Sequence, residues 1–477
     1  MLARSALLLL PVSALAAFPL LAAACSKATA IEAATPIEGV DAGGIAAGDG
    51  PAGVPTTDRD PCRGQPLPDD QHHVPAGLCA RLVGTVPGAR QLMFAPNGDL
   101  FAATGTAILR LRDLDEDGYY TPQEIVQWAA VDTTSAGNNA ALENGYLYVG
   151  SRTGVKRFAY DPLAAKGGAG EDVVVGQPTG GHGRRTVKIW GGSVYVDSGS
   201  AGNATNETST SEYDTRRSLI KRFELSKLAP GRPFQWSDGE IVTVGLRNAN
   251  GFARNEATGR IYAVINGLDN IHYKNVDIHQ DNPGEMIVEI AAGKKYGYPF
   301  CFSVQRLVDD GKVIAPGTQL ANALFPNNPR DDAWCAANAS RPTTFVQAHT
   351  APLDIAFFDR QPKGSLPERW RGGAFVAMHG SWNRAPATGY KVVWQPFNPD
   401  GSSPMPTSTA SATTFPYEIV FGGGTASAPR DGRWSWAATG GAGEEVRPAG
   451  VTVSPIDGAL YVASDAGGGI YRIGMKR

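Results

Sequence analysis

The chain has 477 residues, of which 58 are glycine, 34 are proline and only 19% are charged. This composition argues against a helical bundle and favours many short strands joined by turns. The formal net charge is −3 and the sequence contains no basic tract, so there is no electrostatic case for a nucleic-acid partner.

The N-terminal segment predicts export. Residues 1–24 are typical of a secretory signal peptide, because one arginine precedes a long apolar run that ends in small residues. The sequence LAAAC resembles a bacterial lipoprotein cleavage site, which implies a lipid on Cys25; the alternative is an ordinary signal peptide cleaved after an alanine. Residues 25–60 lack any period and predict a flexible linker. We therefore expect a periplasmic or cell-envelope lipoprotein whose only contact with the membrane is this anchor.

Four cysteines remain when Cys25 is set aside: Cys62, Cys79, Cys301 and Cys335. An even number in an exported protein favours disulfides, and three pairings are possible. Sequence proximity favours Cys62–Cys79 and Cys301–Cys335.

A sequence motif recurs along residues 61–477: a turn followed by a strand in which apolar residues alternate with small or polar ones. Its six copies are PNGDLFAAT (96–104), ENGYLYVGS (143–151), GGSVYVDSG (191–199), TGRIYAVING (258–267), RGGAFVAMHG (371–380) and IDGALYVASD (456–465). Such alternation of apolar and polar residues is typical of half-buried antiparallel strands. Repetition of the motif along the chain indicates a propeller, in which similar blades surround an axis. We predict an all-β, six-bladed β-propeller that is monomeric; two unrelated β-sandwiches are the alternative.

The stretch DLDEDGYYTPQE, residues 113–124, fits a twelve-residue calcium loop at every defined position. Its flanks, ILRLR and IVQWAA, predict strands, so the loop would hold a structural calcium ion and would not open like a helix pair. A solvated acidic turn is the alternative. The expected ligands are Asp113, Asp115, Asp117, Tyr119, Thr121 and Glu124.

The loops at one end of a propeller converge on its channel, so polar residues from distant segments can meet there. His182 lies among glycines in PTGGHGRRT, and its ordinary pKa suits proton abstraction near neutrality. Arg247, Arg384 and Arg447 stand beside Asn, Gly and Trp residues, which favours an anionic, planar ligand. His349 and His379 could also line the channel or serve as structural histidines.

The segments GGHGRRT, GLRNANGFA, DNPGEMIVEIAAGKKYGYPFC, AHTAPLDIAFF and HGSWNRAPATGYKVV together resemble the sorbosone/glucose dehydrogenase family. Its members are exported six-bladed propellers that bind pyrroloquinoline quinone (PQQ) with calcium. The resemblance runs from about Phe94 to the C-terminus. It is nearer to the sorbosone-dehydrogenase-like branch, which includes the fungal pyranose dehydrogenase domain, than to soluble glucose dehydrogenase.

The resemblance implies roles for individual residues. His182 matches the catalytic base, which takes the substrate hydroxyl proton while hydride passes to the quinone, and Arg247 matches the arginine beside the reactive quinone oxygen. The implied cofactor contacts are Arg247, Asn248, Asn383, Arg384 and Arg447. The backbone carbonyls of Gln280 and Asp281 correspond to ligands of the cofactor calcium. The chain departs from glucose dehydrogenase at Asn383–Arg384, which replace a lysine, and at Gln280–Asp281, which replace Gly-Pro.

The sequence thus predicts a PQQ- and calcium-dependent dehydrogenase that oxidises an aldose or a sugar aldehyde such as sorbosone. No CxxCH motif is present, so electrons would pass to a separate acceptor. The alternatives are a calcium-dependent lactonase-type hydrolase and a non-catalytic propeller that binds a partner.

Overall fold

The computed structural model describes residues 62–131, 140–204, 212–359, 364–425, 427–436 and 444–476. The predicted signal peptide, Cys25 and the linker at 25–60 lie outside these residues. Within them, no helix has both the length and the apolar character needed to cross a bilayer.

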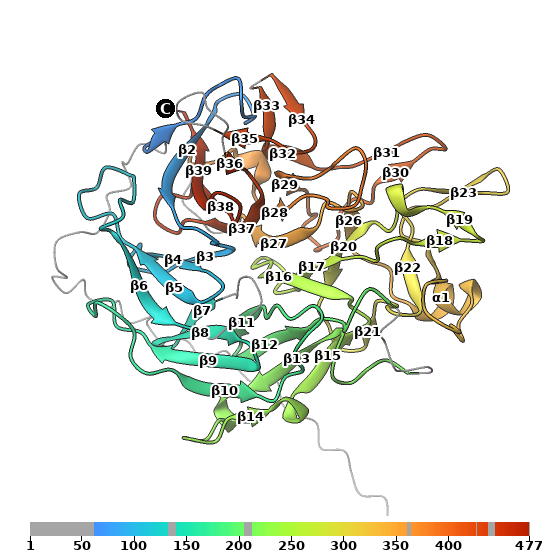
Figure 1. Cartoon of the computed structure of the whole chain (residues 1–477), viewed down its shortest axis with the longest axis horizontal. Coiled ribbons are helices and arrows are strands. Elements are labelled where there is room, and N and C mark those ends of the chain that lie inside the picture. Colours follow the sequence, from blue (N-terminus) through green and yellow to red (C-terminus); the bar gives the residue numbers. More distant parts are fainter. Residues whose placement is uncertain are drawn as a thin grey trace, which may run out of the picture. The chain divides into compact units, whose positions relative to one another are not determined.

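Six sheets surround a common axis, as Figure 1 shows, and the four main strands of each sheet are antiparallel. Blade 1 comprises β3 (Gln91–Phe94), β4 (Leu100–Ala103), β5 (Ala107–Leu111) and β6 (Ile125–Ala130). Blade 2 comprises β7 (Ala140–Glu143), β8 (Tyr146–Ser151), β9 (Gly154–Ala159) and β10 (Glu171–Val175), with β14 (Phe234–Gln235) at its edge. Blade 3 comprises β11 (Val187–Trp190), β12 (Ser193–Ser198), β13 (Leu219–Glu224) and β15 (Glu240–Val244), with β21 (Lys294–Lys295) at its edge.

The second half of the ring repeats this pattern. Blade 4 comprises β16 (Asn248–Arg254), β17 (Ile261–Asn266), β20 (Glu285–Glu289) and β26 (Thr344–Val346). Blade 5 comprises β27 (Pro352–Phe357), β28 (Ala374–Met378), β29 (Lys391–Gln395) and β32 (Glu418–Phe421). Blade 6 comprises β37 (Pro448–Val453), β38 (Leu460–Ser464), β39 (Gly469–Met475) and β2 (Leu78–Thr85), with β1 (Gln65–Pro66) at its edge.

Short hairpins and helical turns extend the blades. The hairpins are β18–β19 (His272–Tyr273, Val276–Asp277), β22–β25 (Cys301–Ser303, Gln319–Ala321), β23–β24 (Leu307–Asp309, Lys312–Ile314), β30–β31 (Thr407–Ser408, Thr413–Thr414), β33–β34 (Gly423–Thr425, Ala428–Arg430) and β35–β36 (Ser435–Trp436, Glu444–Glu445). The helical elements are α1 (Asp332–Asn338) and the 3₁₀ turns Leu225–Lys227, Trp236–Asp238, His279–Asp281 and Glu368–Trp370.

Each copy of the recurring sequence motif contains the second strand of one blade. The six second strands are β4, β8, β12, β17, β28 and β38. Their residues are almost all buried, because each of these strands lies between two others and its sheet packs against neighbouring blades. The predicted six-bladed propeller is confirmed, and the two-sandwich alternative is excluded.

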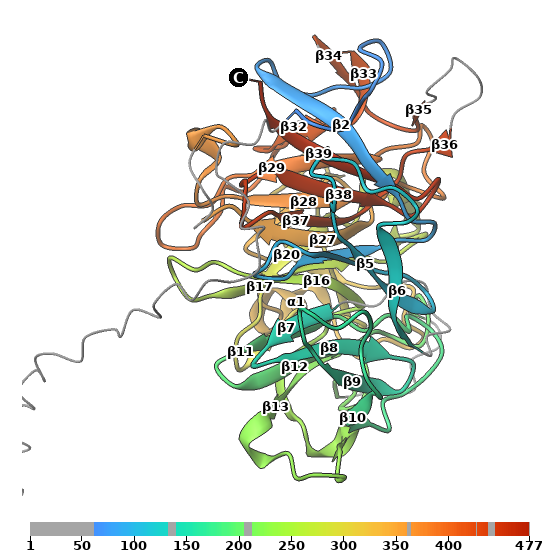
Figure 2. The ribbon, with the colours of Figure 1, turned by 90° about the vertical axis from the view of Figure 1, so that its left-hand side faces the viewer.

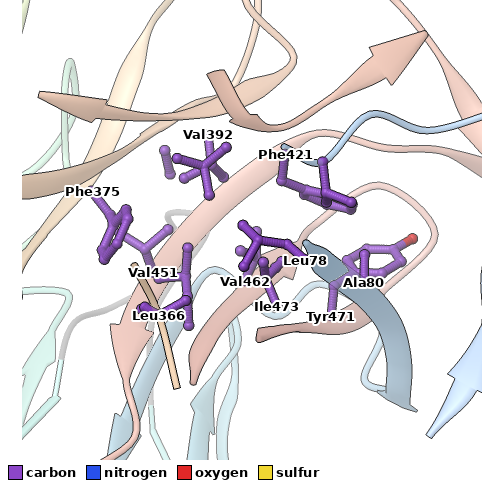
Figure 3. Packing of buried hydrophobic residues seen from close by; sticks show 14 of the residues in the cluster. Leu78, Ala80, Leu366, Phe375, Val392, Phe421, Val451, Val462, Tyr471 and Ile473 are labelled. Carbon is purple, nitrogen blue, oxygen red and sulfur yellow. The ribbon is translucent and has the colours of Figure 1, made fainter. Parts of the chain in front are cut away.

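The ring is closed by pairing the two ends of the described chain. Strand β2 runs antiparallel to β39, with a register from Leu78 opposite Met475 to Thr85 opposite Gly469. Figure 2 shows blue β2 beside dark red β39. Leu78 of β2 packs with Val462 and Ile473 in the apolar core between blades 5 and 6 (Figure 3). Burial of this core stabilises the closed ring.

The strand directions divide the loops between the two ends of the ring. Because neighbouring strands are antiparallel, the loops before each innermost strand and those between the second and third strands open at one end, here called the channel end. Loops between the first and second strands, and between the third and fourth, open at the opposite end. The acidic loop 113–124 joins β5 to β6 and therefore belongs to the opposite end.

Both favoured disulfides are present. Cys62–Cys79 anchors the segment that precedes the closing strand, and Cys301–Cys335 ties α1 to β22 within the insertion of blade 4. The other pairings that the cysteine count allowed are thereby excluded.

We predict that replacing both Cys62 and Cys79 with serine will lower the free energy of unfolding by about 3 kcal/mol. This is the value expected for the length of the loop that the disulfide closes. The two cysteines are 17 residues apart in sequence, and their bond restricts the unfolded chain beside β2. Urea unfolding under non-reducing conditions, followed by tryptophan fluorescence, measures the change. An unchanged unfolding midpoint would show that this bond does not stabilise ring closure.

Candidate functional site

His182 lies in the loop before β11, at the channel end. Its Nδ1 is 2.8 Å from Ser200 Oγ, and its backbone N–H donates to Ser200 O at 2.9 Å. Gly181 has a φ of +62°, and a Cβ there would lie 2.4 Å from Ser200 O, so only glycine allows the two loops to approach this closely. Burial, with a further contribution from Arg247, lowers the pKa of His182 to about 4. The imidazole is therefore neutral near pH 7 and can accept a proton.

Arg247 precedes β16 and is held by its neighbours. Its Nη2 donates to Asp269 Oδ2 at 2.9 Å, and its Nε donates to Asn203 O at 3.3 Å. Burial opposes the charge on Asp269, but hydrogen bonding to His349 and the Arg247 charge keep the pKa of its carboxyl below the ordinary value. The site thus contains a fixed cation close to a neutral base.

Asn248 takes part in an amide network between blades 4 and 5. Its Nδ2 donates to Asn266 Oδ1 at 3.0 Å, and Asn250 donates to the same oxygen at 2.6 Å. Asn266 in turn donates to Pro352 O at 3.0 Å. The network fixes the start of β16, where Asn248 follows Arg247 directly.

His349 lies against the 3₁₀ turn at His279–Asp281. Its Nε2 is 2.5 Å from His279 O and 3.1 Å from Asn282 O, while its Nδ1 is 3.7 Å from Asp269 Oδ1. Burial opposes the imidazolium, but Asp269, Glu285 and the His279 carbonyl outweigh it, so the pKa of His349 is raised. Nε2 of His349 is thus within hydrogen-bonding distance of two carbonyls of this turn, while Nδ1 faces the Asp269 carboxylate.

The predicted calcium residues Gln280 and Asp281 face arginines. Arg384 Nε donates to Gln280 O at 2.7 Å, and Arg384 Nη2 lies 3.5 Å from Asp281 Oδ1. Arg306 forms a second ion pair with Asp281, and Asn383 O is 2.9 Å from His279 Nε2. The turn therefore directs carbonyl oxygens at positive groups, and a calcium ion at Gln280 O would compete with Arg384.

Arg447 and His379 form the part of the channel end that blades 5 and 6 supply. Arg447 donates to His379 O at 3.2 Å and to Gly380 O at 3.1 Å. His379 Nε2 is 2.8 Å from Asp465 Oδ1, and Arg90 Nη1 is 3.2 Å from Asp465 Oδ2. Burial outweighs Asp465 and lowers the pKa of His379 to about 4. His379 is therefore a neutral ring that carries a hydrogen bond.

Arg90 and Arg184 are further candidate residues at the channel end that were not predicted from the sequence. Arg90 Nε and Arg184 Nη1 are buried and make no hydrogen bond with any described residue. Burial and the neighbouring Arg90 charge lower the pKa of Arg184 to about 9. One pattern could have revealed Arg90: it directly precedes an innermost strand, as Arg247 and Arg447 do.

The arginines at the channel end fit a planar anion with several carboxylates, such as PQQ. Two of them have unsatisfied buried donors, and a buried donor without a partner costs free energy unless a ligand accepts its hydrogen bond. Arginine also binds carboxylates through paired, coplanar N–H groups. Donor type and burial at this end therefore match such a ligand.

The acidic loop 113–124 is organised but lies at the opposite end. One oxygen from each of Asp113, Asp115 and Asp117 falls within 4.8 Å of the others. Glu124 accepts from the Leu114 N–H at 2.5 Å and the Thr121 N–H at 2.9 Å. These bonds outweigh the effect of burial, so the pKa of Glu124 is lowered. The structure does not bring this group together with the channel-end residues.

The loop also contacts the strand that closes the ring. The Tyr120 N–H donates to Val83 O of β2 at 2.6 Å, and Arg63 Nη2 lies 4.0 Å from Asp113 Oδ2. The acidic loop of blade 1 is therefore attached to the outer strand of blade 6.

A cavity of about 620 Å³ lies elsewhere, between blades 2 and 3 at the opposite end. Its lining includes Tyr146, Arg157 and Arg222. Both arginines are already paired, at 2.9 Å with Glu171 and at 3.1 Å with Glu240. The cavity therefore lacks the unsatisfied cations of the channel end, and we do not place the anionic ligand there.

Comparisons with known proteins agree on one family. The TrAA12-like family model matches residues 73–476. The chain is 29% identical over 358 residues to the PQQ-dependent pyranose dehydrogenase of Coprinopsis cinerea, covering 70% of this chain and 46% of that protein. It therefore spans about half the length of that relative. It is 25% identical over 414 residues to the PQQ-dependent sugar dehydrogenase of Hypocrea jecorina, covering 82% and 86% of the two chains.

A solved structure supports the same relationship. The holo form of the pyranose dehydrogenase PQQ domain from Coprinopsis cinerea is similar, with a TM-score of 0.70 and 26% identity, covering 87% of this chain and 99% of that one. The matched family region includes each channel-end residue described above.

We predict that the free energy of unfolding will depend less on pH in His182→Gln than in the wild type, in the acid range. In wild type, the unfolded chain binds a proton at His182 below its ordinary pKa of about 6.5, whereas the folded chain does so only near 4. The free energy of unfolding should therefore fall as the pH drops through this window. Melting temperatures at pH 7 and pH 4.5 should differ less in the variant, and equal differences in both proteins would contradict the assignment.

Proposed function

The chain belongs to the TrAA12-like family, and on that premise we propose that it is a PQQ-dependent dehydrogenase that oxidises a pyranose or a related aldose or sugar aldehyde. The observation that carries the proposal is the presence, at one end of the ring, of a partly buried, neutral His182 and of two arginines, Arg90 and Arg184, that each keep an unsatisfied buried donor. The names of the Coprinopsis and Hypocrea relatives support the cofactor and the substrate class.

In this proposal, PQQ binds at the channel end, where its carboxylates meet Arg90, Arg184, Arg384 and Arg447. When bound, the cofactor would supply the two-electron redox chemistry, as the acceptor of the substrate's hydride. Arg247, which is paired with Asp269, lies close enough to His182 for its charge to lower the pKa of that ring. Asn248 and Asn383 complete the proposed contacts.

The chain's own residues provide the base and the electrostatics. His182 accepts the proton from the substrate hydroxyl, because its ring is neutral over the physiological range. Arg247 stabilises negative charge that develops beside it, and it does so without reorganising because Asp269 and Asn203 already fix its guanidinium. The electrons then leave to a separate acceptor.

We also propose two calcium sites. Carbonyl oxygens are calcium ligands, and the cofactor-linked ion would bind at the backbone carbonyls of Gln280 and Asp281, where it would displace Arg384 from Gln280 O. The second ion would bind at Asp113, Asp115 and Asp117, with Tyr119, Thr121 and Glu124 as the remaining candidates. Here the orienting hydrogen bonds from loop N–H groups to Asp113 and Asp117, at 3.1 and 2.7 Å, support a preformed site.

The proposed location is outside the cytoplasm, as a periplasmic or cell-envelope monomer that Cys25 anchors through a lipid. The two disulfides support an oxidising compartment. Mass spectrometry of the mature N-terminus tests the lipid on Cys25.

The direct test is reconstitution of protein lacking residues 1–25. PQQ is titrated with and without calcium, and dye reduction is followed over a panel of aldoses. Saturable PQQ binding and sugar-dependent dye reduction support the proposal. A folded protein that binds no PQQ but hydrolyses lactones would overturn it in favour of the lactonase.

We predict that His182→Gln will lower kcat roughly 10²–10⁴-fold, the usual contribution of a general base, while changing the Kd for PQQ less than threefold. The base acts on the substrate proton, whereas arginines hold the cofactor. His272→Gln is the matched control, because His272 lies on the exposed hairpin strand β18. Equal turnover in the His182 variant and the control would exclude His182 as the base.

Asp115→Asn combined with Asp117→Asn is expected to remove most of the calcium-dependent stabilisation. At a calcium concentration a hundredfold above Kd, one bound ion contributes about 2.7 kcal/mol. Melting curves recorded with calcium and with EDTA give the calcium-dependent stabilisation of the wild type and of the variant. Asp161→Asn serves as control, since Asp161 forms a similar turn, accepting from the Leu163 N–H at 2.8 Å, but lies outside the loop. If the double variant kept the calcium-dependent stabilisation, the stabilising ion would have to bind at another site.

A further inference from the structure

The hydroxyl of Ser200 has two close partners. Its Oγ lies 2.8 Å from His182 Nδ1 and 2.7 Å from Gly202 O. A hydroxyl has one hydrogen to donate, and a carbonyl oxygen has none. The contact with Gly202 is therefore a hydrogen bond only if Ser200 donates it. Ser200 then presents a lone pair to His182, so Nδ1 must carry the imidazole proton.

The same assignment leaves the other ring nitrogen as the base. In a neutral imidazole one nitrogen is a donor and the other an acceptor. With the proton on Nδ1, the lone pair is on Nε2. Among the described parts of the chain, Nε2 of His182 makes no hydrogen bond, whereas Nδ1 is occupied by Ser200. The free nitrogen is thus the one with its lone pair available.

We propose that Ser200 is a positioning residue that holds His182 in the Nδ1-protonated tautomer, so that Nε2 takes the substrate proton. This inference rests on the proposed function for its catalytic consequence. In the step, the substrate O–H bond breaks, an N–H bond forms at Nε2, and the imidazolium keeps its Nδ1–H on Ser200. An isolated histidine side chain favours the Nε2-protonated tautomer, so the enzyme needs a group that selects the other one.

The loop that carries Ser200 is rigid enough for this role. Ser200 has no exposed surface, and its N–H donates to Arg247 O at 2.8 Å. The next residues are fixed as well, because the Tyr298 hydroxyl donates to Asn203 O at 2.9 Å and lies 3.3 Å from Gly202 O. The acceptor that fixes the Ser200 hydroxyl is therefore itself held in place.

Ser200→Ala tests the proposal, and the chain offers a matched control. Ser198 is two residues away and equally buried, and its hydroxyl makes no hydrogen bond with any described residue. We expect Ser200→Ala to lower kcat at least about tenfold, because part of the general-base contribution is lost, with KM changed less than twofold. Ser198→Ala should match the wild type, and Ser200→Thr, which keeps the hydroxyl, should recover most of the rate.

Nitrogen NMR of the histidine rings gives a readout that does not depend on cofactor or turnover. The wild-type protein without PQQ should show a protonated Nδ1 and an unprotonated Nε2 for His182, assigned by the signal lost in His182→Gln. Ser200→Ala should move the proton toward Nε2. A wild-type His182 protonated at Nε2 would overturn the inference even if Ser200→Ala failed to fold, as would equal kcat values for Ser200→Ala and Ser198→Ala. Failure of sugar oxidation alone would leave the tautomer result standing.

Discussion

The pairing of β2 with β39 joins the N-terminal part of the described chain to its C-terminal part, and the channel end exists only while this pairing holds. Closure places the loops of six blades around one axis, so residues far apart in sequence become neighbours. Arg90 precedes the first blade and Asp465 belongs to the last, yet their side chains are 3.2 Å apart. The Cys62–Cys79 bond and the contact of the acidic loop with Val83 both secure the closing strand. Catalysis and stability are thereby linked through one strand pair.

The channel end concentrates positive charge that the protein neutralises only in part. Asp269 and Asp465 pair with Arg247 and Arg90, whereas Arg184 keeps a buried donor without a partner. Such a cluster lowers stability in the free protein, because like charges repel and buried donors lose their hydration. An anionic ligand reverses both costs. The same charges, together with burial, keep His182 neutral, so one arrangement serves both the proposed cofactor site and the proposed base.

Much of this organisation could be predicted from the sequence. The repeated sequence motif marked the second strand of all six blades, because its alternation of apolar and polar residues reflects burial within a sheet. Sequence proximity indicated both disulfides, and His182, Arg247, Arg384 and Arg447 could be singled out as candidates because glycine-rich loops and arginines stand out locally. Ser200 and Asp269 carried no such signal. Their roles depend on contacts between loops that closure brings together, and neither a serine nor an aspartate in a loop is unusual by itself. Backbone carbonyls, as at Gln280, leave no trace in the residue type.

The central claim is that the channel end binds PQQ between His182 and the arginines. A crystal structure of the protein with PQQ tests it most directly. We predict a planar ligand at the channel end, with carboxylates within hydrogen-bonding distance of at least two of Arg90, Arg184, Arg384 and Arg447, and with the reactive carbonyls near His182 and Arg247. PQQ located in the cavity lined by Tyr146 and Arg157, or an empty channel end at saturating PQQ, would contradict the account.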